Sequence, residues 1–353
     1  MISMNEFKIG NQYISKNNPP FIIAEAGINH NGELEKALEM IHVAKKSGVS
    51  AIKFQTFKAE EFISDPSLTY TYTSQNKTIT ESQLELFKRC ELSEHDFFEI
   101  KKTCDDEKII FLSTPQNESD LNMLIKLNIP AIKVGSDDFT NVPLLKNFVR
   151  TNLPIIISCG MSTLEEIKIT LDNIGTLDGY PTALLLTTSE YPTNPENVNI
   201  SKLKTLSENF PQIPLGFSDH TVGDSASSLA IAFGACIFEK HFTLDNSLPG
   251  PDHWFSLNPN KLKIWSDSIK TSYKMIGNEE VKPTNSEIMM KSIARRSIVA
   301  INDIDEGDIF DKNNIGLRRP GTGIQPIMFE SILGKKSLKK IKKFSMLTKE
   351  DFK

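Results

Sequence analysis

Eight short apolar runs, each followed by a helical pattern, constrain the fold of this chain more than any other feature. Each run is too short for a helix and too continuously apolar for a strand with one face in solvent, which is typical of strands buried in a parallel sheet. Strands that alternate with helices pair in parallel, and eight such units close a (βα)₈ barrel. We therefore predict an α/β fold, a (βα)₈ TIM barrel, with a doubly wound open sheet as the alternative. The runs lie at 21–27, 51–57, 109–115, 131–136, 154–160, 183–189, 214–219 and 235–242.

Two helices and one irregular insertion can be placed within this pattern. Apolar residues recur at i, i+3, i+4 and i+7 over 34–48, and Gly48 supplies the stop. A last helix is expected near 260–276. The segment YTYTSQNKT (70–78) has poor periodicity and lies between distant strands, so we expect a loop near the barrel mouth.

A second, smaller domain is expected after the barrel. The polar, proline-containing stretch 277–287 reads as a linker between a barrel over 1–276 and a mostly β module over 288–353. A module of this size has little core of its own and is expected to lean on another surface. Residues 285–353 carry 14 Lys/Arg and 9 Asp/Glu in a chain of net charge −5. No aromatic residues interleave the lysines at 335–343, so these indicate a solvated helix face and no nucleic-acid partner.

The cysteines, the longest apolar stretch and the amino terminus indicate the cellular compartment in which the chain is expected. The four cysteines lie far apart without a C-x-x-C pair, which argues against disulfides and against a cysteine-ligated zinc site. We expect reduced thiols, and a buried thiol at Cys159 in preference to a nucleophile. The longest mostly apolar stretch, 229–238, is too short to span a membrane, and the amino terminus does not read as a secretion signal. A cytoplasmic location without a membrane partner is expected.

Polar residues collect at the carboxyl end of nearly every predicted strand, where the chemistry of a (βα)₈ barrel lies. Two lysines and several hydroxyls converging there suit a compact anion such as a phosphate or carboxylate, whereas a buried Lys–carboxylate pair is the alternative. The strand-end residues are Glu25, His30, Lys53, Gln55, Ser113, Thr114, Lys133, Ser136, Asp137, Asp138, Ser158, Thr187 to Glu190, Ser218 to His220 and Glu239 to His241.

Two histidines among these residues are candidate metal ligands, and two aspartates are candidates for a catalytic base. His220 and His241 follow adjacent strands, within reach of one divalent ion, with Glu25 as a possible third ligand; two hydrogen-bonding histidines are the alternative. Asp138 is the candidate carboxylate base. Capping of the next helix is its alternative role, and Asp137 competes for either one.

Ordered motifs along almost the whole chain resemble those of the sialic acid synthase family. In the barrel these include IIAEAGINHNG (22–32), IKFQTFKAE (52–60), KVGS (133–136), GFSDHT (216–221) and FEKHFTLD (238–245). The tail motifs IARRSIVAINDIDEGD (293–308) and LRRPGTGIQP (317–326) resemble the antifreeze-like (SAF) domain that ends such proteins.

This resemblance implies a transferase that condenses phosphoenolpyruvate with N-acetylmannosamine or a related N-acyl sugar. The product is an N-acetylneuraminate-type 2-keto acid, and phosphate leaves by C–O cleavage. It also implies a divalent metal, Mn²⁺ before Mg²⁺ or Co²⁺, and a homodimer with swapped antifreeze-like domains. By similarity, Lys53, Thr114, Lys133, Ser136, Ser158 and Ser218 bind phosphoenolpyruvate, with Glu25, Lys53, Lys133 and Asp138 catalytic, His220 and His241 on the metal, and Gln55, Tyr191, Asp252 and the partner's Arg319 on the sugar.

The chain departs from the family pattern at three places. Asp137-Asp138 stands where many relatives have Gly-Glu, Leu186 stands where many have histidine, and Cys159 replaces a usual Thr or Ser. These departures do not identify the sugar substrate, so legionaminic or pseudaminic acid synthesis from a 6-deoxy diacetamido sugar is an alternative. A Schiff-base aldolase using Lys133 or Lys240 is another. A non-enzymatic carbohydrate- or ice-binding tail on an inert barrel is the third.

Overall fold

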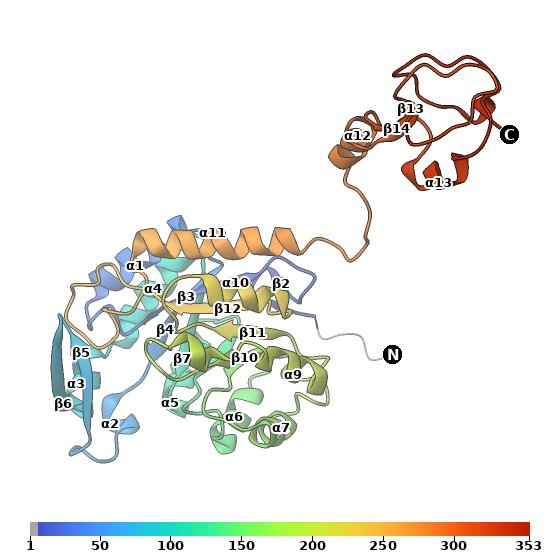
Figure 1. The fold of residues 1–353 in the computed structure, drawn as a ribbon. Helices are drawn as coiled ribbons and strands as arrows, with labels where there is room; N and C mark the ends of the chain where they lie inside the picture. The colour runs from blue at the N-terminus through green and yellow to red at the C-terminus, as the bar shows by residue number, and fades with distance from the viewer. Residues whose placement is uncertain (1–5) are drawn as a thin grey trace. The chain divides into compact units, whose positions relative to one another are not determined.

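A computed structural model describes residues 6–353 (Figure 1). Residues 1–5, the start of the segment read as lacking a secretion signal, lie outside the described residues. The chain divides into two compact units, Met1–Gly277 and Asn278–Lys353. Within residues 6–353, no helix combines the length and the apolar character that a membrane span requires.

Eight parallel strands form the centre of the first unit. Their order in the sheet is β7-β4-β3-β12-β11-β10-β9-β8, and the two end strands lie in contact without a hydrogen-bonded ladder between them. The sheet therefore curls into a nearly closed barrel, which confirms the predicted fold class and rejects the open sheet. The strands are β3 (Phe21–Gly27), β4 (Ala51–Thr56), β7 (Ile110–Pro115), β8 (Ile132–Val134), β9 (Ile155–Ser158), β10 (Thr182–Thr187), β11 (Leu215–Ser218) and β12 (Ile237–His241).

Amphipathic helices cover the outside of the barrel (Figure 1). The first of them, as predicted, buries one stripe that includes Ala37, Ile41 and Ala44 and ends shortly before Gly48, whose φ is 72°. The predicted last helix is also present. The longer helices are α1 (Leu34–Lys46), α3 (Gln83–Cys90), α4 (Glu94–Asp106), α5 (Glu118–Lys126), α6 (Val142–Val149), α7 (Leu164–Asn173), α9 (Lys202–Asn209), α10 (Ser225–Ala232) and α11 (Pro259–Ile276), and the short ones are α2 (Ala59–Phe62) and α8 (Pro195–Val198).

The inside of the barrel changes character along its axis. Inward-facing residues near the strand starts, such as Phe21, Leu112 and Ile156, form an apolar core with a small hairpin, β1 (Phe7–Ile9) and β2 (Gln12–Ile14). The sequence analysis did not anticipate this hairpin. Side chains that alternate along a strand share a face, so the same inward face continues into polar residues such as Lys53 and Lys133 at the carboxyl ends. A pocket inside the barrel must therefore open at the carboxyl ends of the strands.

The insertion expected to be a loop at 70–78 is instead an antiparallel hairpin, β5 (Thr69–Ser74) paired with β6 (Lys77–Ser82). The prediction was wrong because alternating Thr and Tyr favour a strand even where few residues are buried. Gln75 and Asn76, with φ values of 51° and 61°, make the two-residue turn in the left-handed region that suits a twisted hairpin.

The second unit is small and irregular, as expected. It contains α12 (Asn285–Ala294), β13 (Ser297–Ala300) paired antiparallel with β14 (Ile315–Arg318), α13 (Phe329–Ile332), and the 3₁₀ turns η1 (Pro326–Met328) and η2 (Lys349–Asp351). Part of the stretch read as a linker is helical, because Thr284 caps α12 through a capping box. The prediction of a helix face for the lysines at 335–343 was wrong, since they lie on turns and isolated bridges.

Candidate active site

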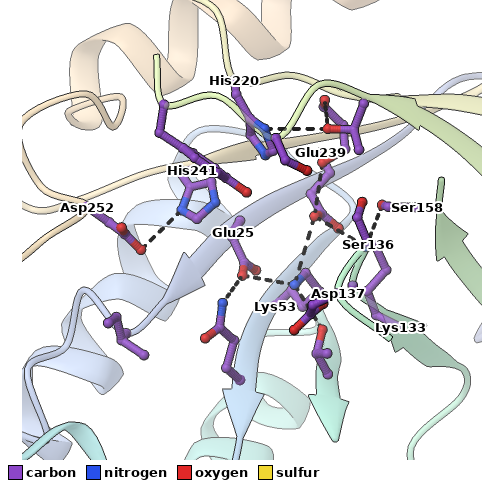
Figure 2. Close-up of a pocket in the computed structure, with 18 of the residues that line it drawn as sticks. Glu25, Lys53, Lys133, Ser136, Asp137, Ser158, His220, Glu239, His241 and Asp252 are labelled. Atoms are coloured by element: carbon purple, nitrogen blue, oxygen red, sulfur yellow. Dashed lines mark hydrogen bonds and ion pairs between the residues drawn. The ribbon is translucent and has the colours of Figure 1, made fainter. Parts of the chain in front are cut away.

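A cavity of about 440 Å³ opens at the carboxyl ends of the barrel strands. Figure 2 shows that its side chains converge from different strands toward one space. Of the fourteen residues predicted for the site, twelve line it. They are Glu25, Lys53, Gln55, Thr114, Lys133, Ser136, Ser158, Tyr191, Ser218, His220, His241 and Asp252.

Two buried lysines and two buried glutamates form the floor of this cavity. Lys53 Nζ lies 2.8 Å from Glu25 Oε1 and 3.8 Å from Glu239 Oε1, and Lys133 Nζ lies 3.6 Å from the same Glu239 oxygen. Burial opposes the charge on Lys53, but Glu239 and Glu25 outweigh it and raise the pKa of this lysine above its ordinary value. Burial lowers the pKa of Lys133 and raises that of Glu25 to about 7. The lysines are thus held in place by carboxylates.

Hydroxyl groups surround the two ammonium groups. Lys53 Nζ donates to Thr114 Oγ1 at 3.1 Å, and Lys133 Nζ donates to Ser158 Oγ at 2.8 Å. Ser136 Oγ accepts a hydrogen bond from the backbone N–H of Gly160, and Ser218 Oγ lies 3.4 Å from Glu239 Oε1. Ammonium and hydroxyl donors at the bottom of a concave pocket can replace the hydration of a small multivalent anion. The structure thus contains both the predicted donor ring and its alternative, the buried Lys–Glu pairs.

His220 and His241 lie side by side in the lining of the cavity, with ring centroids 5.5 Å apart. Burial lowers the pKa of His220 to about 4, and burial together with His220 lowers the pKa of His241 well below its ordinary value, so both rings are neutral near pH 7. His220 Nδ1 lies 2.8 Å from the carbonyl oxygen of Thr188. A carbonyl only accepts, so Nδ1 carries the proton and Nε2 keeps its lone pair.

These two imidazoles fit a divalent cation. Nδ1 of His241 is buried without a hydrogen-bond partner, and its nearest carboxylate oxygen, on Asp252, is 3.8 Å away. Neutral histidines with unused lone pairs are the usual ligands of transition metals. Within residues 6–353, however, no group of three or more His, Cys, Asp or Glu side chains is placed to hold a metal. The chain would therefore supply two ligands and leave the remaining positions open, without Glu25 as the third.

The two adjacent aspartates after β8 have different surroundings. Asp137 lines the cavity near Lys53, as Figure 2 shows. Its carboxylate folds over Gly135, where a Cβ atom would collide with it. Asp138 is not among the lining residues, and its Oδ1 accepts a hydrogen bond from Asn141 Nδ2 at 2.8 Å at the start of α6. The geometry therefore favours Asp137 for a role in the cavity and a local structural role for Asp138.

Three of the four residues predicted to contact a sugar, Gln55, Tyr191 and Asp252, line the cavity. Gln55 Nε2 donates to Glu25 Oε1 at 3.4 Å, and the ring of Tyr191 lies 4.1 Å from that of His220. Burial raises the pKa of Asp252 to about 7. Arg319 belongs to the second unit, where it is exposed and lies beside Phe344 and Pro320.

Comparison with known proteins assigns the chain to a family. The model of the NeuB family matches residues 40–281, and that of the SAF domain matches residues 295–353. The chain belongs to the NeuB family. It is 40% identical over 319 residues to N,N'-diacetyllegionaminic acid synthase of Legionella pneumophila, covering 89% of each chain. It is 32% identical over 333 residues to human N-acetylneuraminate-9-phosphate synthase, covering 93% of this chain and 91% of that one.

A solved structure agrees with this assignment. The N-acetylneuraminic acid synthetase of Leptospira borgpetersenii, in complex with citrate, matches with a TM-score of 0.73 and 33% identity. The match covers 81% of this chain and 94% of the other. The resemblance to sialic acid synthases is thus confirmed at the level of the family.

The sequence analysis assigned no specific role to several residues that line the cavity of this NeuB-family chain. Glu239 is the most important of them, and the signal was present, because Glu239 and His241 are two apart on one strand and must share a face. The apolar wall could not be found in this way, since its residues lie on separate loops and helices and on strand β5. It consists of Ile28, Phe62, Tyr70, Leu86, Phe87 and Met161.

Two reactive candidates lie outside the cavity. Lys240 does not line it and instead pairs with Asp219 at 2.8 Å. Cys159 is buried, its Sγ donates to the carbonyl oxygen of Leu185, and burial raises its pKa to about 12. This agrees with the expected inert thiol at Cys159.

Proposed function

We propose that this chain is a nonulosonic acid synthase, which joins phosphoenolpyruvate to an N-acylated mannosamine-type sugar and releases phosphate. The observation that carries the proposal is the floor of the cavity, where Lys53 and Lys133 lie among hydroxyl groups. Phosphoenolpyruvate has a phosphate and a carboxylate close together, and two ammonium groups beside hydroxyl donors complement that pattern. The functions of two relatives, the N,N'-diacetyllegionaminic acid synthase of Legionella pneumophila and the N-acetylneuraminic acid synthetase of Leptospira borgpetersenii, support the same chemistry.

The reaction consumes one water molecule. C3 of phosphoenolpyruvate attacks the aldehyde carbon of the sugar, a C–C bond forms, and the aldehyde oxygen takes up a proton. Water then adds to the cationic C2 while Asp137 accepts its proton. The C2–O bond to phosphate breaks, phosphate leaves with the bonding electrons, and C2 becomes the ketone. Lys53, Lys133 and the neighbouring hydroxyls hold the phosphate and carboxylate throughout.

A divalent ion, Mn²⁺ before Mg²⁺ or Co²⁺, would be held by His220 and His241. When bound, it would supply Lewis-acid polarisation of the aldehyde carbonyl. Asp252 and Tyr191, which adjoin these histidines, would contact the sugar.

The apolar wall favours a 6-deoxy diacetamido sugar, the legionaminic type, among the possible acceptors. Methyl groups of such a sugar would gain from contact with Phe62, Phe87 and Met161. Among the described residues that line the cavity, Lys53 and Lys133 are the only Lys or Arg side chains, and both already contact glutamates. This leaves no further cation in the described lining of the cavity for a sugar 6-phosphate.

The antifreeze-like domain would complete the site of a partner subunit through Arg319. The exposed guanidinium forms no ion pair within residues 6–353, so it is available to another chain. A domain-swapped homodimer follows as part of the proposal.

A substrate panel tests the proposal. Purified protein is incubated with phosphoenolpyruvate, Mn²⁺ and N-acetylmannosamine, its 6-phosphate or the 6-deoxy diacetamido sugar, and phosphate release and product mass are followed. We expect phosphate and a 2-keto acid in equal amounts, with the highest kcat/KM for the diacetamido sugar. EDTA should abolish turnover and Mn²⁺ should restore it. The absence of turnover with every such sugar would contradict the proposal.

The same preparation distinguishes the two other classes. A Schiff-base aldolase would leave a borohydride-reducible, substrate-dependent adduct on Lys133, whereas the burial of Lys240 against Asp219 argues against that lysine. If the tail were an independent binding module, deletion of 285–353 would leave turnover intact. We expect the deletion to abolish it.

A further inference from the structure

One buried ion pair beside the cavity has no part in the proposed chemistry. Asp219 and Lys240 are 0% and 3% exposed, and Lys240 Nζ lies 2.8 Å from Asp219 Oδ1. Neither side chain lines the cavity. A buried charge pair offers little net stability over apolar residues of the same size, so its presence calls for a reason other than stability.

The positions of the pair in the sequence supply that reason. Asp219 immediately precedes His220, and Lys240 immediately precedes His241. Neighbouring residues of an extended chain point to opposite sides, so the pair faces away from the cavity while the two imidazoles face into it. The ion pair therefore ties together, from behind, the two strand ends that present the histidines.

Further hydrogen bonds make this tie rigid. Asp219 Oδ1 accepts from the N–H and the hydroxyl of Thr221 at 2.8 and 2.7 Å, and Lys240 Nζ donates to the carbonyl oxygen of Thr221 at 2.6 Å. The side chain of Lys240, on β12, thus holds the loop at Asp219 and at Thr221, the residues on either side of His220.

A second set of contacts anchors the pair to the outer helices. Asp219 Oδ2 accepts from Ser227 Oγ at 2.6 Å, and Ser227 Oγ accepts in turn from Trp265 Nε1 at 2.9 Å. Ser227 lies on α10 and Trp265 on α11, and both are buried. Every oxygen of the Asp219 carboxylate is satisfied, which is the condition under which a buried polar network holds one geometry.

We propose that the Asp219–Lys240 pair is a positioning device that sets the separation of His220 and His241 for a shared divalent cation. The proposal rests on the metal role assigned to these histidines in the proposed function. Side chains that orient metal ligands without touching the metal typically change metal affinity by about 10- to 100-fold when they are replaced.

The test measures metal binding by the full-length chain. Asp219→Asn keeps the shape and removes the charge, Lys240→Met removes the ammonium, and the double variant removes both charges and so leaves none unpaired. Leu171→Ala, in the buried face of α7, is the matched control for general loss of packing. Mn²⁺ affinity is measured by calorimetry, the Co²⁺ ligand field by visible absorption, and stability by the thermal midpoint.

We expect both single variants to bind Mn²⁺ about 10- to 100-fold more weakly and to shift the Co²⁺ spectrum. The double variant should regain much of the midpoint lost by Lys240→Met without regaining metal affinity. Leu171→Ala should lose midpoint and keep its affinity and spectrum. Wild-type affinity in the folded Asp219 and Lys240 variants would overturn the proposal, as would an equal loss in Leu171→Ala.

The wild-type protein separates this inference from the proposed function. A wild-type chain that binds neither Mn²⁺ nor Co²⁺ would overturn both the positioning role and the metal role. Metal binding that responds to the variants as expected, in a protein that turns over no sugar, would contradict the synthase assignment alone.

Discussion

At the scale of single residues, the most informative contrast is between Asp137 and Asp138. Both follow the same strand and have the same side chain, yet one faces the cavity and the other accepts a hydrogen bond from Asn141. Gly135 makes the difference possible, because any Cβ atom there would occupy the space of the Asp137 carboxylate.

This contrast predicts unequal effects of the same substitution. Asp137→Asn should lower kcat by about 10²- to 10⁴-fold, the usual contribution of a general base. Asp138→Asn should leave kcat within about threefold, because an amide oxygen can still accept from Asn141. Steady-state phosphate release measures both, with circular dichroism as the control for folding. The reverse order of effects would return the base to Asp138.

At the scale of secondary-structure elements, the hairpin β5–β6 connects the insertion to the cavity. It places Tyr70 in the cavity wall, and Gln75 Nε2 at its turn donates to the carbonyl oxygen of Ser247. Ser74 Oγ also accepts from the N–H of Gly250. The hairpin is therefore fixed to the loop that carries Asp252, and the shape of the sugar end depends on its turn.

A substitution in this turn should weaken binding of the sugar and leave binding of phosphoenolpyruvate unchanged. Asn76 has φ of 61°, a conformation that a β-branched residue adopts only at a cost of about 1–2 kcal/mol. Asn76→Val should raise KM for the sugar several-fold and leave KM for phosphoenolpyruvate unchanged. Asn76→Gly, which accepts this backbone freely, is the matched control. Equal changes in both KM values would argue against a separate sugar end.

The start of α5 contains a carboxyl that predicts a pH dependence of stability. Burial raises the pKa of Asp120 to about 6 from its ordinary 3.8, against hydrogen bonds from Asn117. The folded chain holds this proton more tightly than the unfolded chain, so the stabilisation is complete below pH 3.8 and is lost as the pH rises through about 6. Asp120→Asn should remove this loss, so its free energy of unfolding relative to wild type should rise by about 1–3 kcal/mol between pH 4 and 7. Urea unfolding across this range measures it, and a constant difference would contradict the prediction.

At the scale of the whole molecule, the two units have separate cores and separate pockets. If Arg319 serves the site of another subunit, two inactive variants should complement each other. The Lys53→Met variant lacks one of the two lysines proposed to bind phosphoenolpyruvate, and the Arg319→Ala variant lacks the arginine proposed to reach the other subunit. Random mixing of their subunits should restore about a quarter of the sites, since half of the dimers are mixed and each mixed dimer has one intact site.

The mixing experiment also has an outcome that would contradict the domain swap. If each Arg319 served its own barrel, no mixed dimer would contain an intact site, and the mixture would stay inactive. The mixture is prepared by unfolding and refolding the two variants together, and wild type treated in the same way gives the reference activity.

The barrel, the family and most of the predicted cavity-lining residues could be predicted from the sequence alone. Strand positions were readable because buried parallel strands are continuously apolar, and the closed sheet brings all eight carboxyl ends to one rim. Twelve of the fourteen predicted site residues line the cavity, ten of them at or just after a strand end. The other two, Tyr191 and Asp252, lie on loops and were predicted from the family resemblance alone. The exceptions are Asp138 and Arg319.

Which side chains from separate loops come together could be seen only in the folded chain. The tertiary structure separated Asp137 from Asp138, paired Lys240 with Asp219, and brought Phe62, Phe87 and Met161 to the lining of one cavity. It also showed that the insertion is a hairpin. Periodicity along a chain predicts the face on which a side chain lies, but side-chain direction after a strand ends, and contacts between separate loops, depend on packing that no local pattern records.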